Sequence, residues 1–274
     1  MKIGIVGQGF VGNAVYQKFK NYYEVLTYDL NENKSNSSKR EVYGCEYVFL
    51  CLPTPMSKDG SCYVGYLEDV LNELNLIGDK KTVVIKSTVI PGTTKRFNSF
   101  YNNLSVVFNP EFLTERNAVN DYNNQKRIIL GGPRPSTTIL RQIFSKVFPT
   151  ADIVKTDETH AEMVKYLTNT FLATKVSFAN EMYQICNKLD IDYDKVVEYS
   201  VYDERLGNSH WSVPGPDNDL GYGGHCFPKD VKALIYVADE WLGLYPTMLM
   251  ATDRKNDVVR QNRDWEQMKG RAII

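Results

Sequence analysis

The sequence predicts an α/β fold in which a parallel N-terminal sheet is followed by a mainly helical domain with a long central helix. Up to about residue 150, short β-branched runs alternate with helical stretches, which is typical of a parallel sheet covered by helices on both faces. Beyond about residue 157, apolar residues recur every three to four positions, as on one face of a helix. We therefore expect the 274-residue chain to divide into domains at residues 1–155 and 156–274.

Each element is expected where its pattern is clearest. Strands are expected at residues 2–6, 24–28, 47–51, 82–85, 105–108 and 127–130, with a short last strand near Ile153. Helices between them are expected at 11–20, 63–76 and 136–148, and an exposed polar loop at 31–40. Asp157 is expected to cap a long helix that ends near residue 189. Further helices are expected at 193–200, 230–242 and 246–260, around a loop at 205–225 that is rich in Gly, Pro and Asp.

Composition excludes several classes of protein. The formal net charge of −1 argues against nucleic acid as a partner, and no apolar run is long enough to span a membrane. Five widely spaced cysteines without a secretory signal favour free thiols in a reducing compartment, hence a cytoplasmic protein. Three scattered histidines and the absence of a CxxC pair argue against a metal site.

A glycine-rich turn indicates a dinucleotide site. Gly7, Gly9 and Gly12, with Phe10 and Val11 between them, form a GxGxxG motif between the first strand and the first helix. This is the Rossmann-type arrangement, in which backbone amides at a helix start bind the pyrophosphate. Asp29 ends the second strand, where it can accept the ribose hydroxyls and repel a 2′-phosphate. The expected cofactor is NAD, although Lys34 is compatible with NADP.

The segment from Gly221 to Asp230 indicates covalent chemistry. Its glycines leave the approach to Cys226 open, and Pro228 suits the first turn of a helix. A thiol at a helix start gains thiolate character from the free amides, and Lys229 adds positive charge. The alternative, a buried structural cysteine, fits Cys51 and Cys186 better than Cys226, whose neighbours are glycine, polar and charged.

Two further groups of residues suit a catalytic site. Lys165 and Asn169 share a helix face, and a lysine there can stabilise an alkoxide or lie solvated at the surface. Glu111 and Glu115 follow the fifth strand, where they can act as a base and an anchor or can cap a helix at 116–121. Thr54, Ser87 and Thr88 also follow strands, at the edge where open α/β sheets bind ligands.

Together these motifs resemble the UDP-glucose dehydrogenase family and its relatives that act on UDP-N-acetylmannosamine and GDP-mannose. The resemblance covers nearly the whole chain, through GQGFVG, CLPTP, KSTVIPGT, NPEFLTE, EMVKYLTNTFLATKVSFANE and GYGGHCFPKD. It implies that NAD oxidises the C6 hydroxyl of a nucleotide sugar to a carboxylate, from UDP-glucose to UDP-glucuronate. Cys226 is then the nucleophile, through a thiohemiacetal and a thioester.

The resemblance also implies roles for the other residues. Lys165 stabilises oxyanions, Asn169 and Asp230 position the water or the lysine, Glu111 acts as base in hydrolysis, and Thr88 completes the site. The sugar contacts Arg205, Gly223 and the backbone of Phe112 and Leu113. The NAD site is formed by Gly7, Gly9, Phe10, Val11, Gly12, Asp29, Lys34, Thr54, Ser87 and Glu115.

The sequence departs from the family in places. Members usually carry a third domain that binds the UDP, which we expect to be absent here, and Arg116 stands where glycine is usual. Two alternatives therefore stay open. One is a β-hydroxyacid dehydrogenase, which shares the Lys-xxx-Asn pair but needs no cysteine. The other is a truncated, non-catalytic NAD-binding homologue. A homodimer is expected from the family and from the apolar faces of 157–189 and 246–260.

Overall fold

Seven β-strands form one sheet in the computed structural model, which describes residues 1–274. Their order is β2-β1-β3-β4-β5-β6-β7. Their bounds are β1 (Lys2–Val6), β2 (Glu24–Tyr28), β3 (Tyr47–Leu50), β4 (Lys81–Ile85), β5 (Leu104–Phe108), β6 (Arg127–Gly131) and β7 (Asp152–Thr156). All seven predicted strands are confirmed, and where a range was predicted, its ends differ from the observed ones by one residue at most.

The sheet is mostly parallel, as predicted, but two strands at one edge run the other way. Strands β1 to β5 are parallel, but β6 pairs with β5 in the antiparallel sense at Phe108 and Gly131. Strand β7 is parallel to β6, so both run against the other five. The cause is the connection 109–126. It does not return to the end of the sheet at which β5 begins, so β6 runs in the opposite direction. This connection contains the short helices η2 (Glu115–Asn117) and α5 (Ala118–Asn123).

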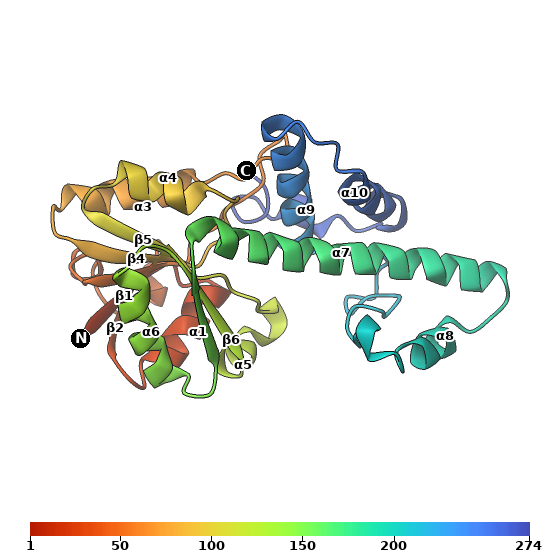
Figure 1. The fold of residues 1–274 in the computed structure, drawn as a ribbon, viewed down its shortest axis with the longest axis horizontal. Coiled ribbons are helices and arrows are strands. Elements are labelled where there is room, and N and C mark those ends of the chain that lie inside the picture. The colour runs from red at the N-terminus through yellow and green to blue at the C-terminus, as the bar shows by residue number, and fades with distance from the viewer. The chain divides into compact units, whose positions relative to one another are not determined.

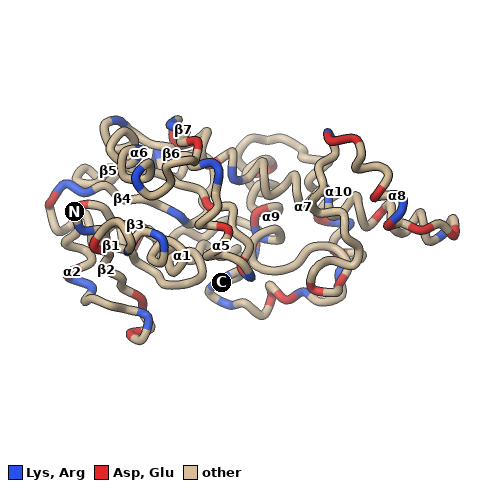
Figure 2. Tube along the Cα trace, turned by 90° about the horizontal axis from the view of Figure 1, so that it is seen from below, with Lys and Arg blue, Asp and Glu red and all other residues tan.

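Helices cover both faces of the sheet (Figure 1). One face packs against α1 (Phe10–Phe19), α5 and α6 (Ser136–Val147), around buried residues such as Phe19, Phe49 and Phe144. The other face packs against α2 (Lys39–Tyr43), α3 (Gly65–Leu76) and α4 (Thr93–Phe100). Successive side chains along each strand point to opposite faces of the sheet, so they enter the two cores in turn. In the view of Figure 2, basic and acidic residues are interspersed over this unit.

The stretch 31–40, predicted to be a loop, is partly helical. It contains the 3-10 helix η1 (Glu32–Lys34) and the start of α2. Ser38 and Glu41 form a capping box, because the Ser38 hydroxyl accepts from the Glu41 N–H and the Glu41 carboxylate accepts from the Ser38 N–H. The Ser-x-x-Glu spacing is a sequence signature of a helix start, which the polar composition of the stretch obscured.

The chain forms two compact units. The first contains Met1–Thr54 and Val64–Lys165, and the second contains Pro55–Tyr63 and Tyr166–Ile274. The long helix α7 (Glu158–Lys188) begins in the first unit and continues into the second. Asp157 accepts a hydrogen bond from the His160 N–H at 3.0 Å, which confirms the predicted cap. No helix is long and apolar enough to cross a membrane.

The second unit is helical. Its elements are α8 (Tyr193–Ser200), η3 (Glu204–Leu206), α9 (Phe227–Tyr236), the π-helix η4 (Val237–Trp241), α10 (Thr247–Val259) and η5 (Asp264–Gln267). The predicted helix at 230–242 is corrected: α9 begins three residues earlier, with Pro228 in its first turn, and becomes a π-helix at Val237. Residues 55–63 fold back as a short hairpin, and Met56 also bridges to Ile273.

Candidate active site

The glycine-rich turn after β1 has the shape that a dinucleotide requires. Gly7 has a φ of +90°, a conformation that L side chains rarely adopt, and a Cβ on Gly12 would lie 1.9 Å from the Gly7 carbonyl oxygen. Gly9 is different, because a Cβ built there meets no atom within 4 Å. Gly7 and Gly12 are therefore needed for the fold itself, and Gly9 leaves open space at the start of α1.

Asp29 joins the end of β2 to this turn. Its carboxylate accepts from the Gln8 N–H at 2.6 Å and from the Asn31 N–H at 2.8 Å. A carboxylate has about four acceptor positions, so two remain for ribose hydroxyls. Lys34 lies exposed in η1, close in sequence to Asp29. The open space at Gly9, the amides of α1 and this half-buried carboxylate fit an NAD molecule.

The hydroxyls that follow β3 and β4 link the two strand ends. Thr54 donates to the Thr88 carbonyl at 2.7 Å, and Ser87 donates to the Leu52 carbonyl at 2.6 Å. Thr54, Ser87 and Thr88 are buried, so the structure brings these three predicted residues together at the carboxyl edge of the sheet. The hydroxyls of Thr54 and Ser87 thus join the two loops to each other.

Lys165 and Glu111 form a buried ion pair in the first unit. The ammonium donates to the Glu111 carbonyl at 2.5 Å and to its Oε1 at 3.2 Å, and it lies 5.3 Å from the centre of the Phe112 ring. Lys165 is 3% exposed, which excludes the solvated alternative. Burial by itself raises the pKa of Glu111, but the charges of Lys165 and Lys86 and the Leu113 N–H outweigh it and hold this pKa below its ordinary value.

Lys86 is a buried residue that the sequence patterns did not single out. It follows β4, donates to Asn109 Oδ1 at 2.8 Å and lies 5.5 Å from the centre of the Tyr122 ring. Burial lowers the pKa of Lys86 to about 8, although Cys51 and Glu111 favour its charged form. The signal available in the sequence was a lysine between a buried strand and the Ser87-Thr88 pair.

In the second unit, Cys226 is the residue that precedes the first turn of α9. Within that turn, Asp230 is 1% exposed and accepts from Asn169 at 2.6 Å and from Lys229 at 2.5 Å. Burial by itself lowers the pKa of Lys229, but Asp230 and the Cys62 and Cys226 thiols raise it above the ordinary value. The structure thus brings Asn169, Asp230 and a charged Lys229 together beside the start of α9.

The remaining predicted residues have varied surroundings. The Leu113 N–H donates to Glu111 at 2.8 Å, and the Phe112 ring is also contacted by Arg127. Glu115 and Arg116 are exposed in η2. Arg205 is exposed in η3 and pairs with Asp203. Gly223 has no room for a side chain, because a Cβ would lie 2.1 Å from the Arg260 guanidinium.

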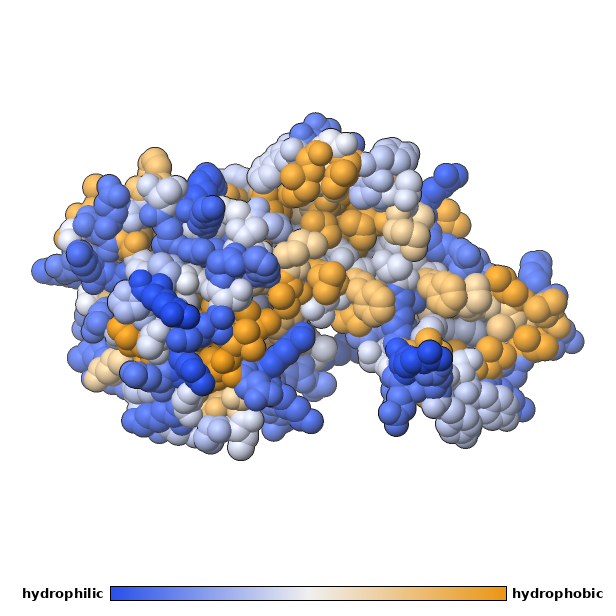
Figure 3. Space-filling view, viewed as in Figure 1, coloured by the Kyte–Doolittle hydropathy of each residue, from blue (hydrophilic) through white to orange (hydrophobic).

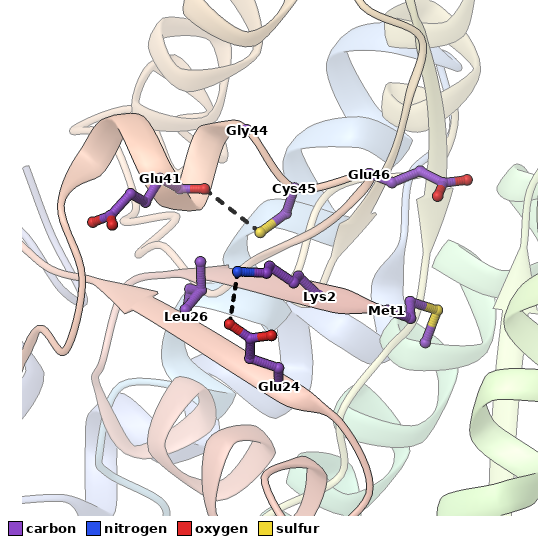
Figure 4. Close-up of a pocket in the computed structure, with 8 residues that line it drawn as sticks. All are labelled: Met1, Lys2, Glu24, Leu26, Glu41, Gly44, Cys45 and Glu46. Atoms are coloured by element: carbon purple, nitrogen blue, oxygen red, sulfur yellow. Dashed lines mark hydrogen bonds and ion pairs between the residues drawn. The ribbon is translucent and has the colours of Figure 1, made fainter.

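A pocket of about 500 Å³ lies elsewhere on the first unit (Figure 4). Its lining comes from Met1, β1, β2, α2 and the segment after α2, with Lys2 paired to Glu24 and the Cys45 thiol facing the Glu41 carbonyl. It contains none of the predicted site residues. The candidate site lies at the opposite, carboxyl ends of the parallel strands.

Two family models match the chain. Residues 30–151 match the NAD-binding domain of the UDP-glucose/GDP-mannose dehydrogenase family, and residues 159–258 match its central domain. UDP-glucose 6-dehydrogenase AglM of Haloferax volcanii is 30% identical, over 94% of this chain and 70% of its own length. UDP-glucose 6-dehydrogenase TuaD of Bacillus subtilis is 29% identical, over 86% of this chain and 59% of its own length.

The fold has similar solved structures. A UDP-glucose dehydrogenase from Pyrobaculum islandicum superposes with a TM-score of 0.83 at 29% identity, over 94% of this chain and 68% of that chain. Among the sequence relatives, the UDP-glucose 6-dehydrogenase of Rickettsia bellii is 36% identical, over 71% of this chain and 45% of its own length. The chain therefore spans between 45 and 70% of the length of these relatives.

Proposed function

Because the chain belongs to the UDP-glucose/GDP-mannose dehydrogenase family, we propose that it oxidises the C6 hydroxyl of a nucleotide sugar to a carboxylate with NAD. UDP-glucose, converted to UDP-glucuronate, is the substrate we favour, since the relatives described above carry that activity in their names. The observation that most supports the proposal is the position of Cys226, which directly precedes a helix whose first turn holds a buried Lys229–Asp230 pair.

NAD, when bound, accepts a hydride in each of the two oxidation steps. Residues of the first unit bind it: the amides at the start of α1 receive the pyrophosphate over Gly9, and Asp29 accepts hydrogen bonds from a ribose. Thr54, Ser87 and Glu115 line the same edge of the sheet. The carboxylate of Asp29 disfavours a 2′-phosphate, which supports NAD over NADP.

Cys226 holds the substrate between the two oxidations. Its thiolate adds to the carbonyl carbon of the aldehyde, and the resulting thiohemiacetal is oxidised to a thioester that water hydrolyses. Retention on sulfur prevents the loss of a reactive aldehyde. Lys165 stabilises oxyanions, Glu111 accepts a proton from water, and Asn169 and Asp230 position the groups around the sulfur. Arg205, Gly223, Phe112, Leu113 and Thr88 contact the sugar or complete its site.

We also propose a cytoplasmic homodimer. None of the five cysteines forms a disulfide, which suits a reducing compartment. Leu167, Phe171 and Phe178 are 52 to 67% exposed on α7, and Figure 3 shows hydrophobic surface along this helix. Large exposed apolar side chains grouped on one element are typical of an association surface. Pairing of α7 with its copy would bury them.

The test is the number of NADH molecules formed per sugar when the protein is incubated with UDP-glucose and NAD+. Two NADH per sugar is the expected result. One NADH with free aldehyde contradicts the thioester step, and supports a single oxidation of the β-hydroxyacid dehydrogenase type. No NADH with UDP-glucose, UDP-N-acetylmannosamine or GDP-mannose, together with saturable NAD binding, supports the non-catalytic alternative.

A substitution of Cys226 tests its proposed role as the nucleophile. Cys226→Ser is expected to stop turnover at or before the second oxidation, because a serine hydroxyl is a far weaker nucleophile than a thiolate near neutral pH. Cys186→Ala is the matched control, since Cys186 lies in a small apolar cluster of the second unit. Equal activity of Cys226→Ser and the wild type would refute the proposed nucleophile.

A further inference from the structure

The backbone of the glycine segment 221–224 is held by side chains from other elements of the second unit. Asn256 of α10 is 2% exposed, and its side-chain amide forms hydrogen bonds with both backbone groups of Tyr222. It accepts from the Tyr222 N–H at 2.7 Å and donates to the Tyr222 carbonyl at 3.0 Å. Asn180 of α7 accepts from the Gly221 N–H at 3.1 Å. Two helices therefore hold the first half of the segment.

Asp264 holds the second half. The Gly224 N–H lies 3.1 Å from each of its carboxylate oxygens, two residues before Cys226. The contact is close-packed, because a Cβ on Gly223 would lie 2.6 Å from the Asp264 carboxylate. Gly221 and Gly224 have φ values of +69° and +70°, so this backbone conformation depends on glycine. A run of glycines has many alternative conformations, and side-chain contacts select one of them.

Arg260 fixes the carboxylate that makes this contact. Its guanidinium is 1% exposed and lies 2.7 Å from Asp217, 3.4 Å from Asp219 and 3.4 Å from Asp264. Burial by itself raises the pKa of Asp217, but the hydrogen bond and charge of Arg260 lower it below the ordinary value. A buried arginine shared by three carboxylates orients all of them, since its donors lie in one rigid plane.

We propose that Asn256 and Asp264 are positioning residues for Cys226, which set where the thiol lies relative to the amides at the start of α9. This inference rests on the proposed function only in taking Cys226 as the reactive thiol. It assigns a role to residues 260–264, which lie beyond the family's central domain at residues 159–258. The part of the chain after α10 is then required to present the nucleophile.

The test measures the rate at which iodoacetamide alkylates Cys226 in the folded protein at pH 7.5, with peptide mass spectrometry to separate the five cysteines. Asp264→Ala is expected to slow this alkylation by about three- to tenfold, because the thiol leaves the helix start that promotes the thiolate. Asp264→Asn keeps an oxygen that accepts from Gly224, so it is expected to recover most of the rate. Glu266→Ala is the matched control, because Glu266 is exposed in the same short helix and pairs with Arg263.

The outcomes are decisive even if one variant is unstable. Should Asp264→Ala unfold, Asn256→Asp replaces it, since this change keeps the acceptor for the Tyr222 N–H and loses the donor to the Tyr222 carbonyl. Slower alkylation of Cys226 in a folded variant, with the other cysteines unchanged, supports the proposal. Wild-type rates in Asp264→Ala or, if that variant unfolds, in Asn256→Asp would overturn it.

The same measurement separates this inference from the proposed function. If the wild type oxidises no nucleotide sugar but the variants alkylate slowly as described, the positioning role stands and the proposed activity fails. If the wild type forms two NADH per sugar and the variants match it in both alkylation and kcat, the activity stands and the positioning role is refuted. If Asp264→Ala is active, it is expected to lose kcat with little change in the KM for NAD, and Asp264→Asn is expected to recover most of that kcat.

Discussion

The Lys165 ammonium binds two oxygens of one residue, the backbone carbonyl and the carboxylate of Glu111, and both side chains are buried. Residues 54 positions apart in the chain thus form one ion pair in the first unit. The backbone contact fixes the turn that follows β5, and the carboxylate contact keeps Glu111 ionised. The pair therefore links the stability of this unit to the chemistry proposed for it.

Removing one partner of the Lys165–Glu111 ion pair should destabilise the protein strongly. Lys165→Met leaves a buried carboxylate without its cation, which is expected to lower the free energy of unfolding by about 3–5 kcal/mol. Urea unfolding at pH 7 measures this loss. Glu111→Gln and the double variant complete a mutant cycle. The double variant should lose less stability than the sum of the losses in the two single variants. A loss below about 1 kcal/mol in Lys165→Met would contradict a buried, coupled pair.

Glu162 should make stability depend on pH. This residue of α7 accepts from the Gly92 and Thr94 N–H groups at the start of α4, at 2.6 and 2.7 Å. Burial raises the pKa of Glu162 to about 7, above the ordinary value of 4.5, despite these donors and with a further increase from Glu158. The folded state therefore binds more protons than the unfolded state between these two values, so this contribution to stability is present below pH 4.5 and falls as pH rises to 7.

The variant Glu162→Gln tests whether the contribution of Glu162 to stability falls as pH rises. The difference in unfolding free energy between wild type and variant is expected to shift by up to about 3 kcal/mol between pH 4.5 and 7.5, with the wild type relatively more stable at the acidic end. Chemical denaturation across this range measures it. Glu158→Gln, one turn earlier on α7, is the control and should leave most of the slope in place. A constant difference would show that Glu162 is ionised throughout.

Two glycines of the dinucleotide turn should respond differently to alanine. Gly12→Ala places a Cβ 1.9 Å from the Gly7 carbonyl oxygen, so the backbone must shift, and destabilisation by several kcal/mol is expected. Gly9→Ala meets no protein atom, so its stability should stay within about 0.5 kcal/mol of wild type. Its NAD affinity should still fall about tenfold or more, because the methyl group fills the space proposed for the pyrophosphate. Urea unfolding and NAD titration by calorimetry measure the two effects, and unchanged NAD affinity in Gly9→Ala would contradict the proposed site.

The exposed face of α7 should control association. Phe171 is 67% exposed there, so Phe171→Asp should leave the fold intact and weaken a dimer. Sedimentation velocity over a range of protein concentrations gives the dissociation constant, which is expected to rise about tenfold or more when a charge replaces a central apolar contact. Leu76→Asp is the control, since Leu76 is 84% exposed at the end of α3. A monomeric wild type at all concentrations would refute the proposed dimer.

Several features could be predicted because their causes are local. The strands at Lys2–Val6 and Glu24–Tyr28 lie where their β-branched residues indicated, and Asp157 caps α7 through a bond three residues away. The capping box at Ser38 was equally local and was missed, because the polar composition of the stretch outweighed its Ser-x-x-Glu spacing. Lys86 was missed for another reason: nothing in its own segment indicates that Asn109 and Tyr122 enclose it.

The sequence by itself determined the seven strands and most of the longer helices, where the dinucleotide turn lies, and that Cys226 precedes a helix. Each of these depends on residues within a few positions of one another. Only the tertiary structure decided that β6 and β7 run against the other strands, that Lys165 is paired with Glu111, and that Asn256 and Asp264 hold the backbone before Cys226. These contacts join residues that are 23 to 54 positions apart, so they depend on how the elements pack, and packing is a property of the whole unit.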